Sequence, residues 1–269
     1  FISVKVNSTV PVILAGGLNP GNIGGRDNVL AVAGAAKEAK IPIRIGVNSG
    51  SIKEEKLRQY GSLTRAMVES AKEQAAMLEE AGFYDIVVSL KASSVQNTVE
   101  ACRIMASECD YPLHLGVTEA GTPYAGIIKS AAGIGCLLLE GIGDTIRVSL
   151  TGSPIEEVRA AKTLLSSLGL RKSPELISCP TCGRCQINLI PIAKAVEEFL
   201  EKIKTPVRVA VMGCAVNGPG EAREADVGIA GGDGCAVLFK KGEVIGKIPE
   251  DKILEVLFSE IKLLANRKE

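Results

Sequence analysis

The chain has 269 residues, 46% of them hydrophobic, which is enough for one large core or two unequal ones. Lysine plus arginine equal aspartate plus glutamate at 31 each, and aromatic residues make up 3%, so neither a basic surface nor a stacking platform for nucleic acid is predicted. No apolar run approaches the roughly 20 residues of a membrane span, so we predict no membrane partner.

The first 170 residues alternate short β-branched runs with amphipathic helical patterns. Strands are predicted at Ile2–Val6, Val10–Ala15, Ile41–Asn48, Asp85–Lys91, Pro112–Thr118, Cys136–Glu140 and Thr145–Leu150. Helices are predicted at Asp27–Lys40, Leu63–Ala81, Val95–Cys109 and Pro154–Leu168. This alternation indicates an α/β fold with a TIM-type barrel over residues 1–170. Because seven strands fall short of eight, we expect the barrel to be incomplete and sequence to be missing near the start.

The pattern changes after Leu170, and residues 171–269 are predicted to form a smaller α+β domain. It opens with a polar linker, Arg171–Glu175, that leads into a cysteine-rich loop. The elements predicted after this loop are a helix at about Asn188–Lys202, a strand at Val207–Met212, a hairpin of Val227–Gly231 and Ala236–Ile248 with its turn at Lys240–Glu243, and a helix from Glu250 to about Asn266.

Polar side chains gather near the carboxyl ends of the predicted strands, where barrels build active sites. By the two-residue period of a strand, the side chains that share such faces are Arg44 and Asn48, Ser89 and Lys91, His114 with Glu119 just past its strand, and Arg147 and Ser149. They include three cations that supply donors suited to a polyanion such as a diphosphate. The alternative is that these charges reach solvent or pair with each other. We favour the anion site, because cations on an interior face need an anion.

Two of these residues are candidates for proton transfer. His114 is the only histidine, and it fits either a hydrogen-bonded structural role or a catalytic one. Glu119 is the better acid or base, since a carboxylate beside phosphate-binding cations can be tuned and positioned. A solvated loop glutamate is the alternative.

Soft-metal ligands are split between two loops of the last third. Cys179, Cys182 and Cys185 lie within Cys-Pro-Thr-Cys-Gly-Arg-Cys, and Cys214 follows about thirty residues later. The Asn-Gly-Pro-Gly stretch after Cys214 cannot stay helical, so the chain can bring Glu221 back toward a metal. Cysteines in Cys-x-x-Cys context favour metal or redox use in a reducing cytoplasm.

Three kinds of site stay open on these residues alone: an iron–sulfur cluster, a structural zinc site with four cysteines, and a redox dithiol. The lone cysteine of the second loop and the weak oxygen ligand favour the cluster, whose fourth iron must exchange its ligand for substrate. Cys185 is either a metal ligand in place of Glu221 or a free thiol next to the site. Cys235 is predicted to be buried filler or to lie near the cluster.

The chain resembles the 4-hydroxy-3-methylbut-2-enyl diphosphate synthases, iron–sulfur enzymes of the methylerythritol phosphate pathway to isoprenoids. The resemblance runs from about Asn19 to the C-terminus. The motifs that carry it are Asn19–Gly24, Ile43–Asn48, Ser89–Ser93, Leu113–Gly121, Gly143–Leu150, Cys179–Arg184 and Gly213–Ala222.

The resemblance implies an oxidoreductase that reductively opens 2-C-methyl-D-erythritol 2,4-cyclodiphosphate: two electrons enter, water leaves, and 4-hydroxy-3-methylbut-2-enyl diphosphate forms. It also implies a second domain like the modules of sulfite and nitrite reductases, a head-to-tail homodimer, and ferredoxin or flavodoxin as the electron donor.

The resemblance assigns residue roles by motif position. The ligands of a [4Fe–4S] cluster would be Cys179, Cys182, Cys214 and Glu221. The diphosphate would be held by Arg44, Asn48, Lys91, Arg147 and Ser149. Glu119 would donate a proton to the departing hydroxyl, with His114 nearby.

This sequence departs from the family pattern at the front, where Gly16–Leu18 replaces an expected arginine, and in carrying Cys185 and Cys235. An alternative interpretation is an aldolase-like barrel with Lys91 as a Schiff base and a structural zinc module. A third is a non-catalytic module in which zinc stabilises a partner-binding domain.

Overall fold

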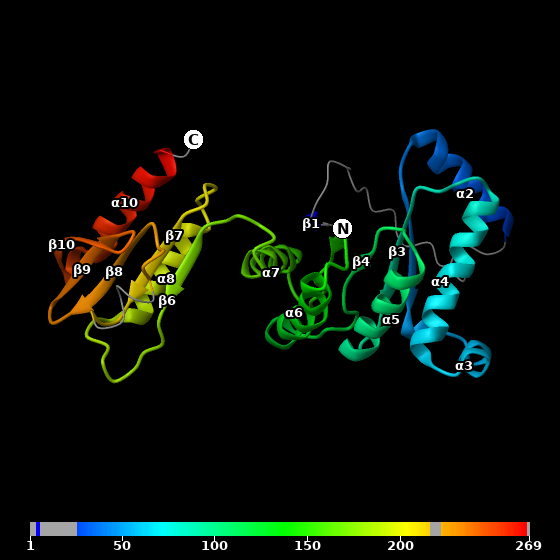
Figure 1. The fold of residues 1–269 in the computed structure, drawn as a ribbon, viewed down its shortest axis with the longest axis horizontal. Helices are drawn as coiled ribbons and strands as arrows, with labels where there is room; N and C mark the ends of the chain where they lie inside the picture. Colours follow the sequence, from blue (N-terminus) through cyan, green and yellow to red (C-terminus); the bar gives the residue numbers. More distant parts are fainter. Residues whose placement is uncertain (1–3, 6–25, 216–221, 268–269) are drawn as a thin grey trace. The chain divides into compact units, whose positions relative to one another are not determined.

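The computed structural model describes residues 4–5, 26–215 and 222–267, which belong to two compact units, Phe1–Arg171 and Lys172–Glu269 (Figure 1). The predicted strand Val10–Ala15, the expected gap near the start and the predicted ligand Glu221 lie outside the described residues. Within those ranges, no helix is both long enough and apolar enough to span a bilayer.

The first unit alternates strands and helices along the chain. Its strands are β1 (Val4–Lys5), β2 (Ile43–Asn48), β3 (Ile86–Lys91), β4 (His114–Leu115) and β5 (Thr145–Ile146). Its helices are α2 (Arg26–Ala39), the 3₁₀ turn η1 (Ser49–Ser51), α3 (Glu54–Tyr60), α4 (Leu63–Glu80), α5 (Val95–Glu108), α6 (Pro123–Leu139) and α7 (Pro154–Ser167). The four predicted helices are confirmed to within one residue at each end, whereas the sequence patterns do not predict α3 or α6.

Strands β2 to β5 follow one another in space in the order of the chain. β2 runs parallel to β3, and β4 runs parallel to β5. A parallel bridge between Val88 and Leu113 connects β3 to the chain just before β4, while β1 pairs antiparallel with β5. The α/β prediction is confirmed. The described strands do not join into a closed ring, so the barrel is seen only as an arc in this part of the chain.

β2 shows how the sequence separates the two faces of the arc. Ile43, Ile45 and Val47 are buried in the unit's hydrophobic core, and α4 packs against this strand. The alternate residues Arg44 and Gly46 are only half-buried. Because successive side chains point to opposite faces of a strand, the cation lies on the face away from the helical core.

The predicted strand Cys136–Glu140 is wrong, because Cys136 lies inside α6 and Glu140 is the cap that ends it. α6 begins at Pro123, a favourable first helical position, and continues through an apolar run. At Gly133 a side chain would lie 2.7 Å from Val117 Cγ2, so the helix packs closely on neighbouring chain. α6 carries apolar residues on its exposed side as well, such as Tyr124, Ile128 and Leu139, so it shows no polar stripe. A short part of its apolar run then looks like a buried strand.

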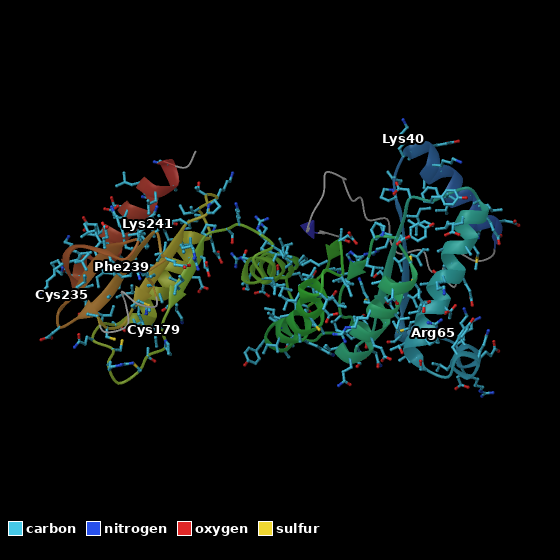
Figure 2. All side chains as sticks on the ribbon, in the orientation of Figure 1. Lys40, Arg65, Cys179, Cys235, Phe239 and Lys241 are labelled. Atoms are coloured by element: carbon cyan, nitrogen blue, oxygen red, sulfur yellow. The ribbon has the colours of Figure 1, made fainter. Side chains whose placement is uncertain are left out.

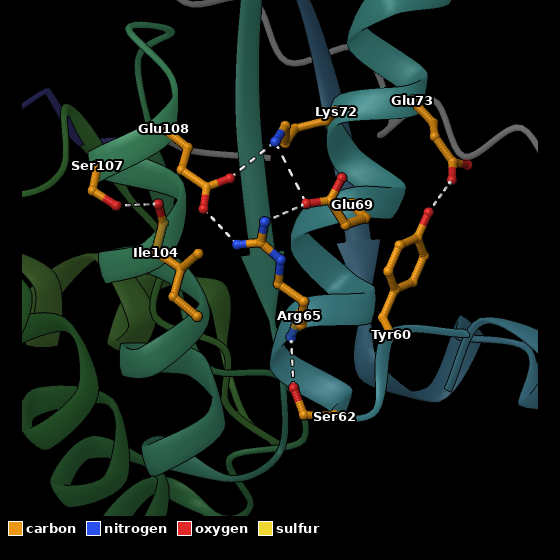
Figure 3. Close-up of polar contacts among 9 residues, drawn as sticks. All are labelled: Tyr60, Ser62, Arg65, Glu69, Lys72, Glu73, Ile104, Ser107 and Glu108. Atoms are coloured by element: carbon orange, nitrogen blue, oxygen red, sulfur yellow. Dashed lines mark hydrogen bonds and ion pairs between the residues drawn. The ribbon is translucent and has the colours of Figure 1, made fainter. Parts of the chain in front are cut away.

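Local conformation and charge connect the surface helices of this unit. α2 is followed by Lys40, which adopts a left-handed φ of 53° (Figure 2). Between α4 and α5, Glu108 pairs with Arg65 and, at 2.9 Å, with Lys72; Glu69 lies within 3.4 Å of the same lysine (Figure 3). These exposed pairs join two neighbouring helices but contribute little stability individually.

The second unit is a mixed sheet with two main helices. Its elements are β6 (Glu175–Ser178), α8 (Leu189–Leu200), β7 (Arg208–Met212), β8 (Val227–Gly232), β9 (Cys235–Lys240), β10 (Glu243–Pro249), the 3₁₀ turn η2 (Glu250–Lys252) and α10 (Ile253–Arg267). The strand order is β10-β9-β8-β7-β6, with β6, β7 and β8 parallel and the two hairpins antiparallel. The sequence interpretation ends its linker at Glu175 and misses β6, a short edge strand.

The two faces of this sheet carry different cores. Val209, Val211 and Ile229 lie in the larger core, to which α8 and α10 contribute. Met212 and Phe239 belong to a smaller, alanine-rich core. Alternation along β7 therefore points 210 and 212 to one face and 209 and 211 to the other.

The outer hairpin confirms the predicted turn. Lys241 and Gly242 connect β9 to β10 with φ values of 48° and 81°, the pair of positive angles that defines a type I′ turn. β10 is an outer strand of the sheet and has a register shift between Val244 and Gly246. Val244 and Ile245 are exposed on it.

Candidate functional site

Three cations, Arg44, Lys91 and Arg147, and a histidine come together on the parallel strands of the first unit and just after them. β2 and β3 end side by side, with Asn48 opposite Lys91. β4 starts at His114, which pairs with Thr145 of β5. Arg147 follows β5, and its backbone N–H donates to the Leu115 carbonyl oxygen at 2.9 Å. Strand pairing alone therefore brings together residues that are more than thirty positions apart in sequence.

Lys91 lies against the backbone of the neighbouring strand segment. A side chain at Gly116 would lie 3.2 Å from Lys91 Cε and 2.8 Å from the Arg147 carbonyl oxygen. Glycine is thus required at 116 for these segments to approach this closely. Burial, followed by repulsion from Arg44 and Arg147, lowers the pKa of Lys91 from 10.5 to about 7.

His114 is enclosed, with 1% of its surface exposed. Its Nδ1 lies 2.8 Å from Thr145 Oγ1, while Nε2 is buried with no hydrogen-bond partner among the residues described. Burial, then the nearby Lys91, Arg44 and Arg147, lowers the pKa of His114 to about 2. The ring is therefore neutral, and Thr145 fixes its orientation.

Arg44 is the clearest sign of an anion site. Its Nε and Nη1 atoms are buried and find no acceptor in the described parts of the chain. Burial and the repulsion of Arg147 lower its pKa. Two buried guanidinium nitrogens without acceptors are costly, so the arrangement is suited to a ligand that brings negative oxygens.

Glu119 follows β4 and is exposed, with a left-handed φ of 53°. Left-handed backbone is unfavourable for residues other than glycine, asparagine and aspartate, and such strain clusters at functional sites. Ser149 is half-buried two residues beyond Arg147, and Asn48 is exposed. Glu119, Asn48 and Ser149 thus lie at or just after strand ends. Among the described contacts, no hydrogen bond or ion pair connects their side chains to the three cations.

The cysteine loops of the second unit follow adjacent parallel strands. Cys179 comes directly after β6, and Cys214 comes two residues after β7. The Gly213 backbone N–H donates to Cys179 Sγ at 3.2 Å (Figure 2 labels Cys179). A side chain at Gly213 would lie 2.7 Å from Cys185 Sγ. Two of the three thiols of the first loop, Cys179 and Cys185, therefore lie against the residue that precedes Cys214.

Other thiols of this unit are placed differently. Cys182 is exposed, and hydrogen bonds from Arg184 lower its pKa, whereas Cys214 is buried. Cys235 is half-buried in the β8–β9 hairpin, opposite Gly232. No group of three or more metal-binding side chains is assembled within the described ranges. The donor set of unoxidised thiols suits a soft metal, but the described part of these loops does not form a preformed cage.

Two family models match this chain. One, described as the GcpE TIM-barrel domain, matches residues 8–162, and the other, the GcpE protein C-terminal domain, matches residues 175–263. The chain belongs to the GcpE family. Its first unit is accordingly a TIM-barrel domain, of which the described strands form an arc.

Curated GcpE-family relatives carry one name, 4-hydroxy-3-methylbut-2-en-1-yl diphosphate synthase (flavodoxin). The protein from Ruminiclostridium cellulolyticum is 60% identical over 246 residues, covering 91% of this chain and 70% of the relative. That from Clostridium perfringens is 58% identical, covering 92% and 71%. That from Geobacter sulfurreducens is 53% identical, covering 98% and 81%. The aldolase-like and zinc-module interpretations are not favoured by these similarities.

In this GcpE chain, sequence reasoning misses the residues that position the site. Thr145 shares the two-residue period with Arg147 and Ser149, and that signal could have placed it beside the cations. Its pairing with His114 depends on the register of two separate strands. The need for glycine at 116 and 213 likewise arises from neighbours that are distant in sequence.

Proposed function

We propose that this chain catalyses the reaction of its family: the reductive ring opening and dehydration of 2-C-methyl-D-erythritol 2,4-cyclodiphosphate to 4-hydroxy-3-methylbut-2-enyl diphosphate. It is an oxidoreductase of isoprenoid biosynthesis, and the flavodoxin in the name of its relatives supports flavodoxin as the electron donor. Ferredoxin is the alternative donor. The observation that carries the site assignment is the buried cationic group, whose Arg44 atoms find no acceptor in the described residues.

The diphosphate is bound by Arg44, Lys91 and Arg147 in this proposal. Repulsion among these three groups is relieved when an anion arrives, and the lowered pKa of Lys91 then rises because the charged amine gains a partner. Asn48 and Ser149 add neutral donors at the strand ends. The cations thus hold the substrate and offset its charge.

Proton transfer is assigned to the residues beside this anion site. Glu119, held just past β4 in a left-handed conformation, delivers a proton to the departing hydroxyl so that it leaves as water. His114 stays neutral and points one ring nitrogen at the substrate, while Thr145 holds the other. Its role is orientation and hydrogen bonding, because a ring with so low a pKa is a poor proton donor.

Cys179, Cys182, Cys214 and Glu221 would hold the [4Fe–4S] cluster. When bound, the cluster would relay electrons from the donor to the substrate, and its weak carboxylate ligand would leave one iron open to exchange. Support comes from Cys179 and Cys214, which follow adjacent parallel strands, and from the Gly213 N–H that donates to the Cys179 sulfur. The exposed Cys182 must move inward to join them. Because this ligand set requires reduced thiols, the cytoplasm is the proposed location.

The arrangement of subunits is also a proposal. In a head-to-tail homodimer, the second unit of one subunit would serve the barrel of the other, as the resemblance implies. The likeness of this unit to sulfite and nitrite reductase modules belongs to the same proposal. Mixing an Arg44→Gln chain with a Cys182→Ser chain tests it: activity should return in mixed dimers, and two inactive parents that stay inactive after mixing would contradict it.

The test of the anion site is Arg44→Gln. Loss of a charge-assisted hydrogen bond costs ~1.5–3 kcal/mol, so the affinity for the cyclic diphosphate should fall roughly 10- to 100-fold by calorimetry. Arg58→Gln is the matched control, because Arg58 is 81% exposed on α3 and pairs only with Glu54 among the residues described. Equal losses in both variants would overturn the assignment. Separately, anaerobically prepared protein should contain about four irons and four sulfides per chain.

A further inference from the structure

We propose that Cys182 and Cys185 are a modification site: they form a reversible disulfide in the cluster-free protein. The family resemblance assigns no role to Cys185, and the proposed cluster does not use it. The disulfide itself stands on the geometry of the loop. Its consequence for cluster loading rests on the proposed function, which makes Cys182 a ligand.

The backbone of the loop sets the distance between the two residues. The Cys185 N–H donates to the Cys182 carbonyl oxygen at 3.0 Å, which closes a four-residue turn over Cys-Gly-Arg-Cys. The Cα atoms at the ends of such a turn lie within about 7 Å, and disulfides span Cα separations of ~4.4–6.8 Å. The turn therefore holds the pair at a separation that a disulfide can bridge with little backbone movement.

The two thiols differ in access, as a redox pair requires. Cys182 is exposed, so an oxidant in solution reaches it first. Cys185 is half-buried and donates its S–H to the Ile187 carbonyl oxygen at 3.3 Å. Its backbone is held by the turn, and the neighbouring Gln186 N–H donates to the Gly213 carbonyl oxygen at 2.9 Å. The second thiol is thus kept beside the first and shielded from direct oxidation.

Cys179 is the competing partner for Cys182, and the structure disfavours it. Its sulfur accepts the Gly213 N–H at 3.2 Å and packs against the buried cores of the sheet. Pro180 follows it and biases Cys179 toward extended backbone. Among the described residues, no backbone hydrogen bond closes the step from Cys179 to Cys182.

The chemistry balances with a peroxide as the oxidant. The Cys182 thiol reduces hydrogen peroxide and becomes a sulfenic acid, releasing one water. The Cys185 thiol then attacks that sulfur, the S–S bond forms and a second water leaves. Two thiols are oxidised by two electrons in total, and a dithiol reductant reverses the step. The disulfide withholds Cys182 from the metal and protects it from irreversible oxidation to the sulfinic acid.

Trypsin offers a direct test on the full chain. Cleavage after Lys172, Arg184 and Lys194 separates Cys182 and Cys185 into peptides 173–184 and 185–194. After peroxide treatment of cluster-free protein, mass spectrometry should find these peptides joined, two hydrogens lighter than their sum. Dithiothreitol should separate them. Cys179→Ser should keep the linked pair, which excludes Cys179 as the partner.

Variants at Cys185 test whether this residue is the partner of Cys182 in the disulfide. Cys185→Ser and Cys185→Ala should lose the linked peptides and accumulate the Cys182 sulfinic acid, while far-UV circular dichroism checks that both fold. Cys235→Ser is the matched control and should behave as wild type. A wild-type chain that gives a disulfide within peptide 173–184, or over-oxidises Cys182 as fast as Cys185→Ser does, would overturn the proposal.

Iron loading separates this proposal from the proposed function. Oxidised wild-type chain should incorporate less iron and sulfide than reduced chain. Treatment of the oxidised chain with dithiothreitol should restore its loading to that of the reduced chain. If the disulfide forms but loading is unchanged, the disulfide stands and the assignment of Cys182 as a cluster ligand fails. If no disulfide forms while Cys182→Ser still reduces loading, the ligand assignment stands and the dithiol proposal fails.

Discussion

Replacing Lys91 by methionine should make the protein more stable while weakening its hold on substrate. Burial and the neighbouring Arg44 and Arg147 lower the pKa of Lys91 from 10.5 to about 7, so its charged form is disfavoured in the folded chain. Methionine fills a similar volume without a charge. Groups that weaken the fold in this way are typical of functional sites.

The size of the stability gain follows from the lowered pKa of Lys91, and it decreases as the pH rises. A difference of one in pKa equals ~1.4 kcal/mol, so the folded chain loses on the order of 3–5 kcal/mol when Lys91 is charged in both states. This cost is fully present below about pH 7. Above that pH the folded chain releases the proton while the unfolded chain keeps it, so wild-type stability rises until about pH 10.5. The advantage of Lys91→Met should therefore be largest near pH 6 and vanish toward pH 10.5.

Urea unfolding of cluster-free protein, followed by far-UV circular dichroism because the chain has no tryptophan, measures this difference. Lys162→Met is the control, since Lys162 is exposed on α7 and its replacement should change stability by less than ~0.5 kcal/mol. In parallel, calorimetry should show weaker binding of the cyclic diphosphate to Lys91→Met. A stability difference that is independent of pH, or a variant less stable than wild type at pH 6, would refute the reasoning.

Three further substitutions test how the sites are positioned. Gly116→Ala should destabilise the chain by ~1–3 kcal/mol and weaken diphosphate binding, because its new methyl group would lie 2.8 Å from a backbone carbonyl oxygen. Thr145→Val should cost ~1–3 kcal/mol and release the His114 ring into a mixture of tautomers, whereas wild type should show one neutral tautomer from pH 5 to 8 by ¹⁵N NMR. Gly213→Ala should lower iron content on reconstitution, because its methyl group would meet Cys185 Sγ at 2.7 Å.

Each of these predictions has a control within the chain. Gly34→Ala should not destabilise, since nothing lies within 4 Å of its added methyl group and alanine is the better helix former. Thr145→Ser should keep the wild-type ¹⁵N spectrum, which is unambiguous because His114 is the only histidine. Cys185→Ala added to Gly213→Ala should restore part of the iron content. A tautomer unaffected by Thr145→Val, or full iron loading of Gly213→Ala, would contradict the positioning described above.

The faces of single strands could be predicted from the sequence, because they depend only on the two-residue period. The alternation around Arg44 correctly separates the cation from the helical core, and the hairpin turn is correctly predicted at Lys240–Glu243. These features are local. They do not depend on which strands lie next to them in the fold.

Features that depend on distant neighbours could not be predicted in the same way. The run around Cys136 is apolar although Leu139 of α6 is exposed, and periodicity alone does not separate such a helix from a buried strand. The contact between His114 and Thr145 requires the register of two strands. The difference between the exposed Cys182 and the buried Cys214 likewise depends on how two loops fold at the end of the sheet.

The irregular outer strand of the second unit bears on how the protein behaves at high concentration. A regular edge with exposed aliphatic side chains such as Val244 and Ile245 would be a template for adding a strand from another molecule. The bulge before Gly246 interrupts the row of backbone N–H and C=O groups with which an added strand would pair. Lys247 adds charge to this edge, and Pro249 ends it without an N–H to donate. Self-association through open β-structure is thus discouraged without a covering helix.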